Sequence, residues 1–189
     1  MIVGLGNPGN QYHQTRHNAG AECVELLAQQ LHANLQPEKR YQGLYAKAHI
    51  GSQDIHLLIP TTFMNLSGQS VQTLASYFKI PVEHILVAHD ELDIDPGNAR
   101  FKQGGGHGGH NGLRDIIAKF GGNKMFYRLR LGIGHPGNAK QVASFVLKKA
   151  PQNERELTLA AIDTALQSIP DLVSGNLQKA MNDLHSFKA

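Results

Sequence analysis

The segment FKQGGGHGGHNGLRD, from Phe101 to Asp115, contains six glycines, two histidines and an asparagine. Glycine loses more backbone entropy on folding than any other residue, so a dense run is costly unless the backbone bends tightly or approaches a ligand closely. The segment lies between a strand-like run, residues 99–103, and a helix-like run, residues 113–120. The pattern predicts a substrate-facing loop that leaves the carboxyl end of a strand and enters a helix. A flexible linker is the alternative.

Strand-like and helix-like segments alternate on both sides of this loop. Strands are expected at residues 2–5, 44–50, 55–60, 85–88, 99–103 and 126–133. Helices are expected at residues 19–32, 71–78, 113–120, 153–169 and 176–185. This alternation predicts an α/β fold, and the hairpin within residues 44–60 makes its sheet mixed. We therefore expect a single domain, residues 1–189, with a twisted, largely parallel sheet flanked by helices.

Composition narrows the class of protein and its compartment. No apolar run approaches the roughly 18 residues of a membrane span, and the N-terminus lacks the pattern of a signal peptide. Cys23 is the single cysteine, so no internal disulfide can form. A reducing compartment fits that usage. We expect a cytoplasmic protein without a membrane partner.

The positive charge is concentrated in the middle of the chain. The net charge is only +3, yet the stretch from Arg100 to Arg130 holds seven lysines and arginines and one acid, Asp115. Clustered cations bind a polyphosphate more tightly because they release its counterions, so this pattern favours a nucleic acid as partner. A solvated basic face is the alternative.

A dinucleotide-like motif opens the chain. Residues 4–9, GLGNPG, match G-x-G-x-x-G. A dinucleotide site also needs a helix that opens at once and an acid that closes the next strand. Here Pro8 interrupts, and a polar loop continues to Asn18 before the helix. We therefore exclude a dinucleotide site.

Polar residues follow several of the predicted strands, where α/β proteins bind ligands. The candidates at these strand ends are Asn7, Tyr12, Arg16, His17 and Asn18 after the first strand, Phe63, Met64 and Asn65 after the 55–60 strand, His89, Asp90 and Glu91 after the 85–88 strand, and His107, His110 and Asn111 in the glycine loop. No G-x-S-x-G motif is present, so a covalent serine intermediate is not expected. A histidine oriented by a carboxylate can instead activate water, and His17 with Asp90 is the pair that we choose. Asparagine amides can donate to the oxygen on which negative charge develops.

Metal and nucleotide-phosphate sites receive little support. The spacing His107-x-x-His110 resembles a ligand pair but lies in a glycine loop rather than on a helix, and no H-E-x-x-H or cysteine cluster accompanies it. No Gly-Lys-Ser/Thr follows the glycines. We expect neither a metal nor a cofactor.

Several ordered motifs together resemble one family. They are residues 4–20, GLGNPGNQYHQTRHNAG; residues 60–68, PTTFMNLSG; residues 89–93, HDELD; residues 104–113, GGGHGGHNGL; and residues 128–136, RLRLGIGHP. Over residues 1–137 the chain resembles bacterial-type peptidyl-tRNA hydrolase. The remaining part agrees in length and helical character only. The chain also lacks the few residues that often precede the first strand in that family.

The resemblance implies a monomeric enzyme that cleaves the ester between a peptide and the 3′ end of tRNA, without a metal. It implies His17 as general base, oriented by Asp90, with Asn7 beside them. It also implies substrate contacts from Tyr12, Met64, Asn65, Gly108, His110 and Asn111. Lys102 and Arg130 match the residues expected to clamp the 5′-phosphate of tRNA near its acceptor stem and CCA end. The competing hypothesis is a binding module that holds structured RNA on the basic face without chemistry.

Overall fold

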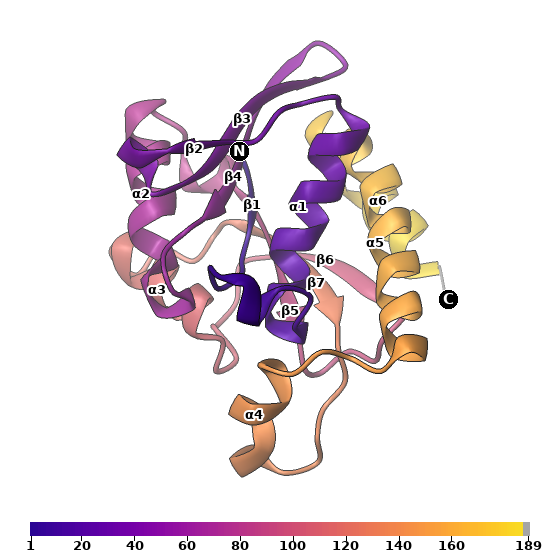
Figure 1. The fold of residues 1–189 in the computed structure, drawn as a ribbon. Helices are drawn as coiled ribbons and strands as arrows, with labels where there is room; N and C mark the ends of the chain where they lie inside the picture. The colour runs from indigo at the N-terminus through magenta and orange to yellow at the C-terminus, as the bar shows by residue number, and fades with distance from the viewer. Residues whose placement is uncertain (187–189) are drawn as a thin grey trace.

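A computed structural model describes residues 1–186 and contains one seven-stranded sheet in the order β2-β3-β4-β1-β5-β7-β6 (Figure 1). The strands are β1 (Ile2–Gly4), β2 (Gln36–Glu38), β3 (Gly43–Ile50), β4 (Gln53–Pro60), β5 (Leu86–Glu91), β6 (Ala99–Gln103) and β7 (Tyr127–Gly132). The four central strands, β4-β1-β5-β7, run parallel, whereas β2, β3 and β6 join antiparallel to their neighbours. The expected mixed α/β sheet is therefore confirmed.

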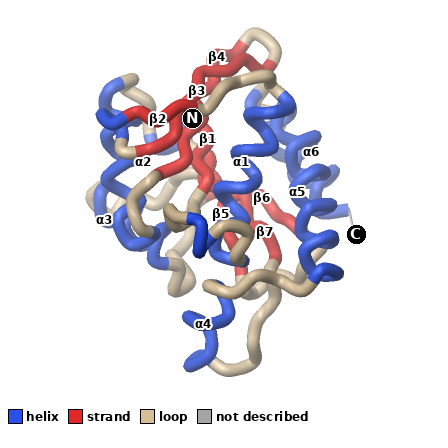
Figure 2. The backbone as a smooth tube through the Cα atoms, in the orientation of Figure 1, coloured by secondary structure: helices blue, strands red, loops and turns tan. Residues whose placement is uncertain are grey.

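Helices cover both faces of the sheet (Figures 1 and 2). One face carries α1 (Ala19–Gln30), α5 (Gln152–Val173) and α6 (Leu177–Ser186), and the other carries α2 (Ser67–Tyr77) and α3 (Asn111–Lys119). Each face has its own apolar cluster, because successive side chains of a strand point to opposite sides. In β5, Leu86 and Ala88 pack in the first cluster and Val87 packs in the second. The central strands are thus buried on both faces.

The short helix α4 (Val142–Val146) lies apart from these layers, beyond the end of the sheet at which β5 and β7 finish (Figure 1). The sequence did not predict α4 or the edge strand β2. Both are short, and α4 has too few turns to show an apolar stripe. No helix within residues 1–186 is both long and apolar enough to cross a membrane.

The start of α1 is pressed against β5 through a glycine. A Cβ atom at Gly20 would lie 2.1 Å from the carbonyl oxygen of Ala88, so only glycine permits this approach. The loop before α1 is thereby held beside the carboxyl end of β5. That contact brings the two halves of the predicted histidine–carboxylate pair together.

Two local predictions were wrong. The strand expected at residues 85–88 continues through His89 and Asp90 to Glu91, because ladder pairing with β7 carries these polar residues into the sheet. The side chain of Asn18 accepts no hydrogen bond from the first turn of α1, so it is not the expected helix cap. It bonds to the backbone of Asn7 instead.

Candidate active site

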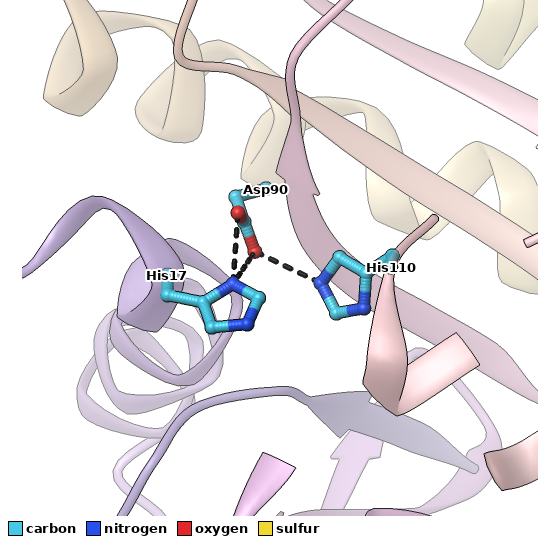
Figure 3. Close-up of side chains that lie close together, drawn as sticks. All are labelled: His17, Asp90 and His110. Atoms are coloured by element: carbon cyan, nitrogen blue, oxygen red, sulfur yellow. Dashed lines mark hydrogen bonds and ion pairs between the residues drawn. The ribbon is translucent and has the colours of Figure 1, made fainter. Parts of the chain in front are cut away.

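The carboxylate of Asp90 lies between two imidazoles at the end of β5 (Figure 3). Its two oxygens each lie 2.9 Å from Nδ1 of His17, and Oδ1 also lies 2.9 Å from Nε2 of His110. Asp90 is 4% exposed, and the rings of His17 and His110 have centroids 4.9 Å apart. The predicted pair is therefore assembled, with a second histidine on the same carboxylate.

Hydrogen bonding fixes a different tautomer on each histidine. Since a carboxylate only accepts, His17 carries its proton on Nδ1, and its Nε2 makes no hydrogen bond with any residue in the range 1–186. Nδ1 of His110 accepts from the amides of Gly112 and Leu113, so its proton is on Nε2 and is donated to Asp90. His17 therefore has a free lone pair, whereas both ring nitrogens of His110 are occupied.

Electrostatics reinforce this arrangement. Burial disfavours the charged form of His17, but the charge of Asp90 and its hydrogen bond outweigh burial, so the pKa of His17 is raised above its ordinary value. Burial alone would raise the pKa of Asp90, yet the two histidines hold that pKa far below its ordinary range. Asp90 is consequently an anion at neutral pH. His17 is a stronger base than a free histidine.

The loop that supplies His17 is tied down at several points. The amide of Asn7 donates to Oδ1 of Asn18, and Nδ2 of Asn18 donates back to the carbonyl of Asn7, both at 2.9 Å. Arg16 is 8% exposed and stacks on the ring of Phe145. Its guanidinium also donates to the carbonyls of Phe145 and Lys149 and to the carboxylate of Glu154. His17 therefore stands on a short 3-10 helix (Arg16–Asn18) anchored on both sides.

Two of the predicted asparagines have their carbonyl oxygens occupied. Oδ1 of Asn7 accepts from the amide of Met64 at 2.8 Å, and Oδ1 of Asn111 accepts from Arg114 at 3.0 Å. Neither Nδ2 group makes a hydrogen bond within residues 1–186, so both amides present donors. Asn65 is exposed one residue beyond Met64.

Met64 is placed differently from the expectation that it lines the cleft. Its side chain is 4% exposed and packs beneath Gly112, where a Cβ atom would lie 2.6 Å from the methionine sulfur. Only its backbone reaches the asparagine network, through the amide that Asn7 accepts. Met64 therefore supports the start of α3 and the orientation of Asn7.

A cavity of about 500 Å³ opens over the two histidines. Its walls come from the end of β5, the glycine loop and α4, including His17, Asp90, Gly108, His110, Asn111 and Val142. The apolar side of α4 faces the polar ends of the strands across this space. The cavity therefore combines a base, free donors and an apolar wall.

Tyr12, Lys102 and Arg130 were also predicted as site residues, but they do not line this cavity. Tyr12 is half-buried on a short 3-10 helix (Asn10–Tyr12). Arg130 donates from Nε to Glu91 at 2.9 Å, and exposed Lys102 stands opposite Arg128 rather than Arg130 in the ladder between β6 and β7. Opposed residues share a face of the sheet, so Lys102 and Arg130 lie on the same face.

His17, Asp90 and His110 are also a group whose nitrogen and oxygen atoms lie close enough, within 4.8 Å of one another, to reach one metal ion. A metal ligand must present a free lone pair. Nδ1 of His17 and Nε2 of His110 instead donate protons to Asp90. In this hydrogen-bonded form His17 offers a lone pair on Nε2 only, and His110 offers none, so the three residues cannot all be ligands at once. His107 binds the amide of Gly109 within its own loop.

Three polar groups near the site are buried, which the sequence did not predict. Arg16 and Arg128 are buried arginines, and His89 is a buried histidine beside Asp90. Burial, followed by the proximity of His110, lowers the pKa of His89 to about 3, so it is neutral. Arg16 was a candidate at a strand end and Arg128 a member of the basic stretch, but only the three-dimensional structure shows that both cations are buried.

A mixed α/β sheet with an oriented, unprotonated histidine nitrogen in a cavity at its strand ends defines an enzyme of the acid–base type. The whole chain, residues 1–189, matches the sequence profile of the family described as peptidyl-tRNA hydrolase. It is 60% identical to peptidyl-tRNA hydrolase of Shewanella amazonensis and 56% identical to that of Marinomonas sp., covering 100% of this chain and 97% of each relative. A crystal structure of peptidyl-tRNA hydrolase from Acinetobacter baumannii superposes with a TM-score of 0.96 at 50% identity, covering 99% of this chain and 94% of that one. The chain belongs to the peptidyl-tRNA hydrolase family.

Proposed function

We propose that this protein hydrolyses the ester bond between the peptide, or an N-blocked aminoacyl group, and the 3′ end of tRNA, with a water molecule activated by His17. The observation that carries the proposal is the free Nε2 of His17, whose proton is held on Nδ1 by the Asp90 carboxylate. A neutral imidazole in this tautomer can accept a proton without rearrangement. Family membership supplies the substrate class.

The proposed reaction has no covalent intermediate. Nε2 of His17 takes a proton from water while the water oxygen attacks the ester carbonyl. The resulting tetrahedral oxyanion expels the 3′ oxygen of the ribose, which takes the proton from Nε2 of His17, and the peptide leaves with a free carboxyl group. Asp90 stabilises the imidazolium that forms on His17, as a buried carboxylate does in a triad. The activated ester requires no nucleophile stronger than this water.

The asparagine donors complete the site. Nδ2 of Asn7 and Nδ2 of Asn111 are free because their oxygens are occupied, so they can stabilise the oxyanion or hold the substrate carbonyls. Exposed Asn65 and half-buried Tyr12 would contact the peptide and the CCA end, where an aromatic ring can stack on a base. Gly108 lines the cavity directly, while Met64 acts through Asn7.

His110 is proposed to position rather than to transfer protons. Its Nδ1 is occupied by two amides of α3 and its Nε2 by Asp90. It therefore links the glycine loop, the helix and the carboxylate. No lone pair is left with which it could act as a base.

Lys102 and Arg130 are proposed to bind the 5′-phosphate of tRNA beside the acceptor stem. Both stand on one face of the ribbon formed by β6 and β7, and Lys102 has no hydrogen bond or ion pair within residues 1–186. A phosphate contact would use this free ammonium and the guanidinium edge that Arg130 does not give to Glu91. Such contacts do not depend on sequence, so one enzyme could accept many tRNAs.

A discharge assay on N-blocked aminoacyl-tRNA tests the proposal. The wild type should release the blocked amino acid, and a chelator should leave the rate unchanged. His17→Ala should lower kcat by roughly 10²–10⁴-fold, the usual contribution of a general base, while tRNA affinity stays within a few-fold. His84→Ala, just before the amino-terminal end of β5 and so at the opposite end of that strand from Asp90, is the matched control and should be as active as wild type. Near-normal turnover by His17→Ala would remove the base assignment, and RNA binding without turnover by the wild type would favour a binding module.

The cellular role follows from the reaction. We propose that the enzyme recycles peptidyl-tRNA during translation, as a monomer and in the cytoplasm, and that residues 1–189 act as one domain. The family match over the full chain supports the single domain, and the buried unpaired thiol of Cys23 fits a reducing compartment. Sedimentation at increasing concentration tests the monomer, because a mass above 20.6 kDa would contradict it.

A further inference from the structure

Arg128, in the middle of β7, is a buried cation that holds the root of the glycine loop. It is 4% exposed, and its guanidinium donates to the carbonyl oxygens of Gly105 and Gly106. It makes no ion pair within residues 1–186. Buried charges are normally paired with a countercharge, because desolvation is expensive. The two main-chain carbonyls are thus the partners that keep this arginine in place.

The surroundings of Arg128 are short of negative charge. Its guanidinium lies 4.8 Å from the centre of the Phe126 ring, and its Nε atom is buried without a partner. Lys102 stands opposite it in the ladder, Arg130 lies two residues further along β7, and the carboxylate of Glu91 is already bonded to Arg130. Burial, and after it the charge of Arg130, lowers the pKa of Arg128. An anion bound among Lys102, Arg128 and Arg130 would offset the repulsion between their positive charges.

Arg128 also marks where the fixed part of the glycine loop ends. The amide of Gly104 is bonded to the carbonyl of Phe126, and the next two carbonyls are held by Arg128. Beyond them, a Cβ atom at Gly106, Gly108 or Gly109 would meet nothing within 4 Å. The loop is fixed again at His110, which caps α3 and binds Asp90. The loop is therefore anchored at its two ends and open in between.

Lys102 connects this anchor to the proposed phosphate site. Its Cε and Nζ atoms lie 3.1 Å from the position that a Cβ atom on Gly105 would occupy. The ammonium is therefore beside the same glycine that Arg128 holds through its carbonyl. A phosphate bound by Lys102 would consequently act on the loop root directly.

We propose that Arg128 is a positioning residue that couples phosphate binding at Lys102 and Arg130 to the conformation of the glycine loop. An anion in the cation cluster strengthens the hold of Arg128 on Gly105 and Gly106. This ordering of the loop presses His110 against Asp90 and so steadies His17. The anchor itself stands on the contacts of Arg128, whereas the coupling rests on the proposed function, since it requires the tRNA phosphate.

Hydrogen exchange on the free protein tests the anchor without any substrate. Arg128→Lys keeps the charge but loses the planar fork that reaches two carbonyls. The amides of Gly109 and His110, which bond to His107 inside the loop, should exchange about tenfold faster than in wild type. Arg100→Lys, an exposed position on β6, is the matched control and should leave them unchanged. If Arg128→Lys fails to fold, Arg128→Met removes the buried charge at similar volume and is expected to show the same loss of protection. Wild-type exchange in a folded Arg128 variant would overturn the anchor.

Turnover of paired substrates tests the coupling. N-blocked aminoacyl-tRNA is compared with and without its 5′-phosphate, and the ratio of the two kcat values is the readout. The ratio should exceed one in wild type and fall toward one in Arg128→Lys, while the Kd of deacylated tRNA changes only a few-fold. An unchanged ratio in Arg128→Lys would overturn the coupling. A wild-type ratio of one would instead overturn the phosphate contact of the proposed function, and the exchange experiment would still decide the anchor by itself.

Discussion

The opening loop and the glycine loop each deliver one histidine to Asp90, yet they are built in opposite ways. Residues 7–18 are held by side chains at both ends, through the Asn7–Asn18 pair and the buried Arg16. The glycine loop is held at its ends only and has open space around Gly106, Gly108 and Gly109. The firmly held loop presents the histidine with a free nitrogen, and the open loop presents the one whose nitrogens are both bonded.

This difference separates two requirements of the reaction. Proton transfer needs a base held within a fraction of an ångström of its productive position. Entry and release of a large substrate need a wall that can move. In the proposed mechanism, the short 3-10 helix bearing His17 meets the first requirement and the glycines with few contacts meet the second. The carboxylate of Asp90 is the one group to which both of these histidines bond.

The largest effect is expected from Asp90→Asn, which removes the link between the loops. The amide cannot hold both histidines in their present tautomers, so kcat should fall on the order of 10³-fold or more.

The raised pKa of His17 also depends on the charge of Asp90. Because only neutral His17 is active, kcat/KM of the wild type should be lost as the pH falls through that raised pKa, above the ordinary value of about 6.5. In Asp90→Asn this acid limb should move to lower pH. A pH profile of kcat/KM measures the acid limb of the wild type and of Asp90→Asn. An acid limb at the same pH in both proteins would contradict the role of Asp90.

His110→Asn is expected to have a smaller effect, because it changes the bonded histidine only. Asparagine is a good helix cap, so the start of α3 should survive, while one hydrogen bond to Asp90 is lost. We expect about a tenfold loss of kcat, the size of one charge-assisted hydrogen bond. The acid limb of kcat/KM should remain controlled by His17. A loss as large as that of His17→Ala in the same discharge assay would make His110 a second proton-transfer group.

The sequence was sufficient for the fold and for the pairing of His17 with Asp90, because strand ends and ordered motifs are local signals. It was not sufficient for the way in which each loop is held. Asn18 was expected to cap α1, but its amide bonds to Asn7 eleven residues earlier. The anchors of Arg16 lie more than 120 residues away in the chain. Such partners are decided by packing between distant segments, which periodicity and composition do not record.

Arg16→Gln tests the rigidity of the opening loop. It breaks the ion pair with Glu154 and the contacts with two carbonyls, so the free energy of unfolding should fall by about 2 kcal/mol. We expect kcat to fall up to about tenfold with little change in KM, because His17 loses its support rather than its chemistry. Urea unfolding and steady-state kinetics measure the two effects.

Arg155→Gln is the matched control for that variant. Arg155 joins α5 to Glu22 in α1 through an ion pair but contacts no carbonyl of the α4 region. Because this ion pair is partly exposed, Arg155→Gln should lower the free energy of unfolding by about 1 kcal/mol or less. It should leave kcat unchanged. Equal losses of kcat in Arg16→Gln and Arg155→Gln would show that general destabilisation, and not the position of His17, explains the Arg16 result.

The smallest effect is expected within the glycine loop. Gly108 has φ of +54°, in the left-handed region, and a Cβ atom added there would meet nothing within 4 Å. Gly108→Ala should therefore lower the free energy of unfolding by about 1 kcal/mol without a clash, and the same strain should appear as a few-fold change in kcat/KM. Gly106 has the same open space but no positive φ, so Gly106→Ala should match wild type in both measurements. If Gly106→Ala and Gly108→Ala lower the free energy of unfolding by the same amount, the glycine loop is packed in solution as firmly as the opening loop. The two loops would then not differ in the way described above. If Gly108→Ala lowers kcat/KM and Gly106→Ala does not, the activity depends on the left-handed backbone conformation at Gly108.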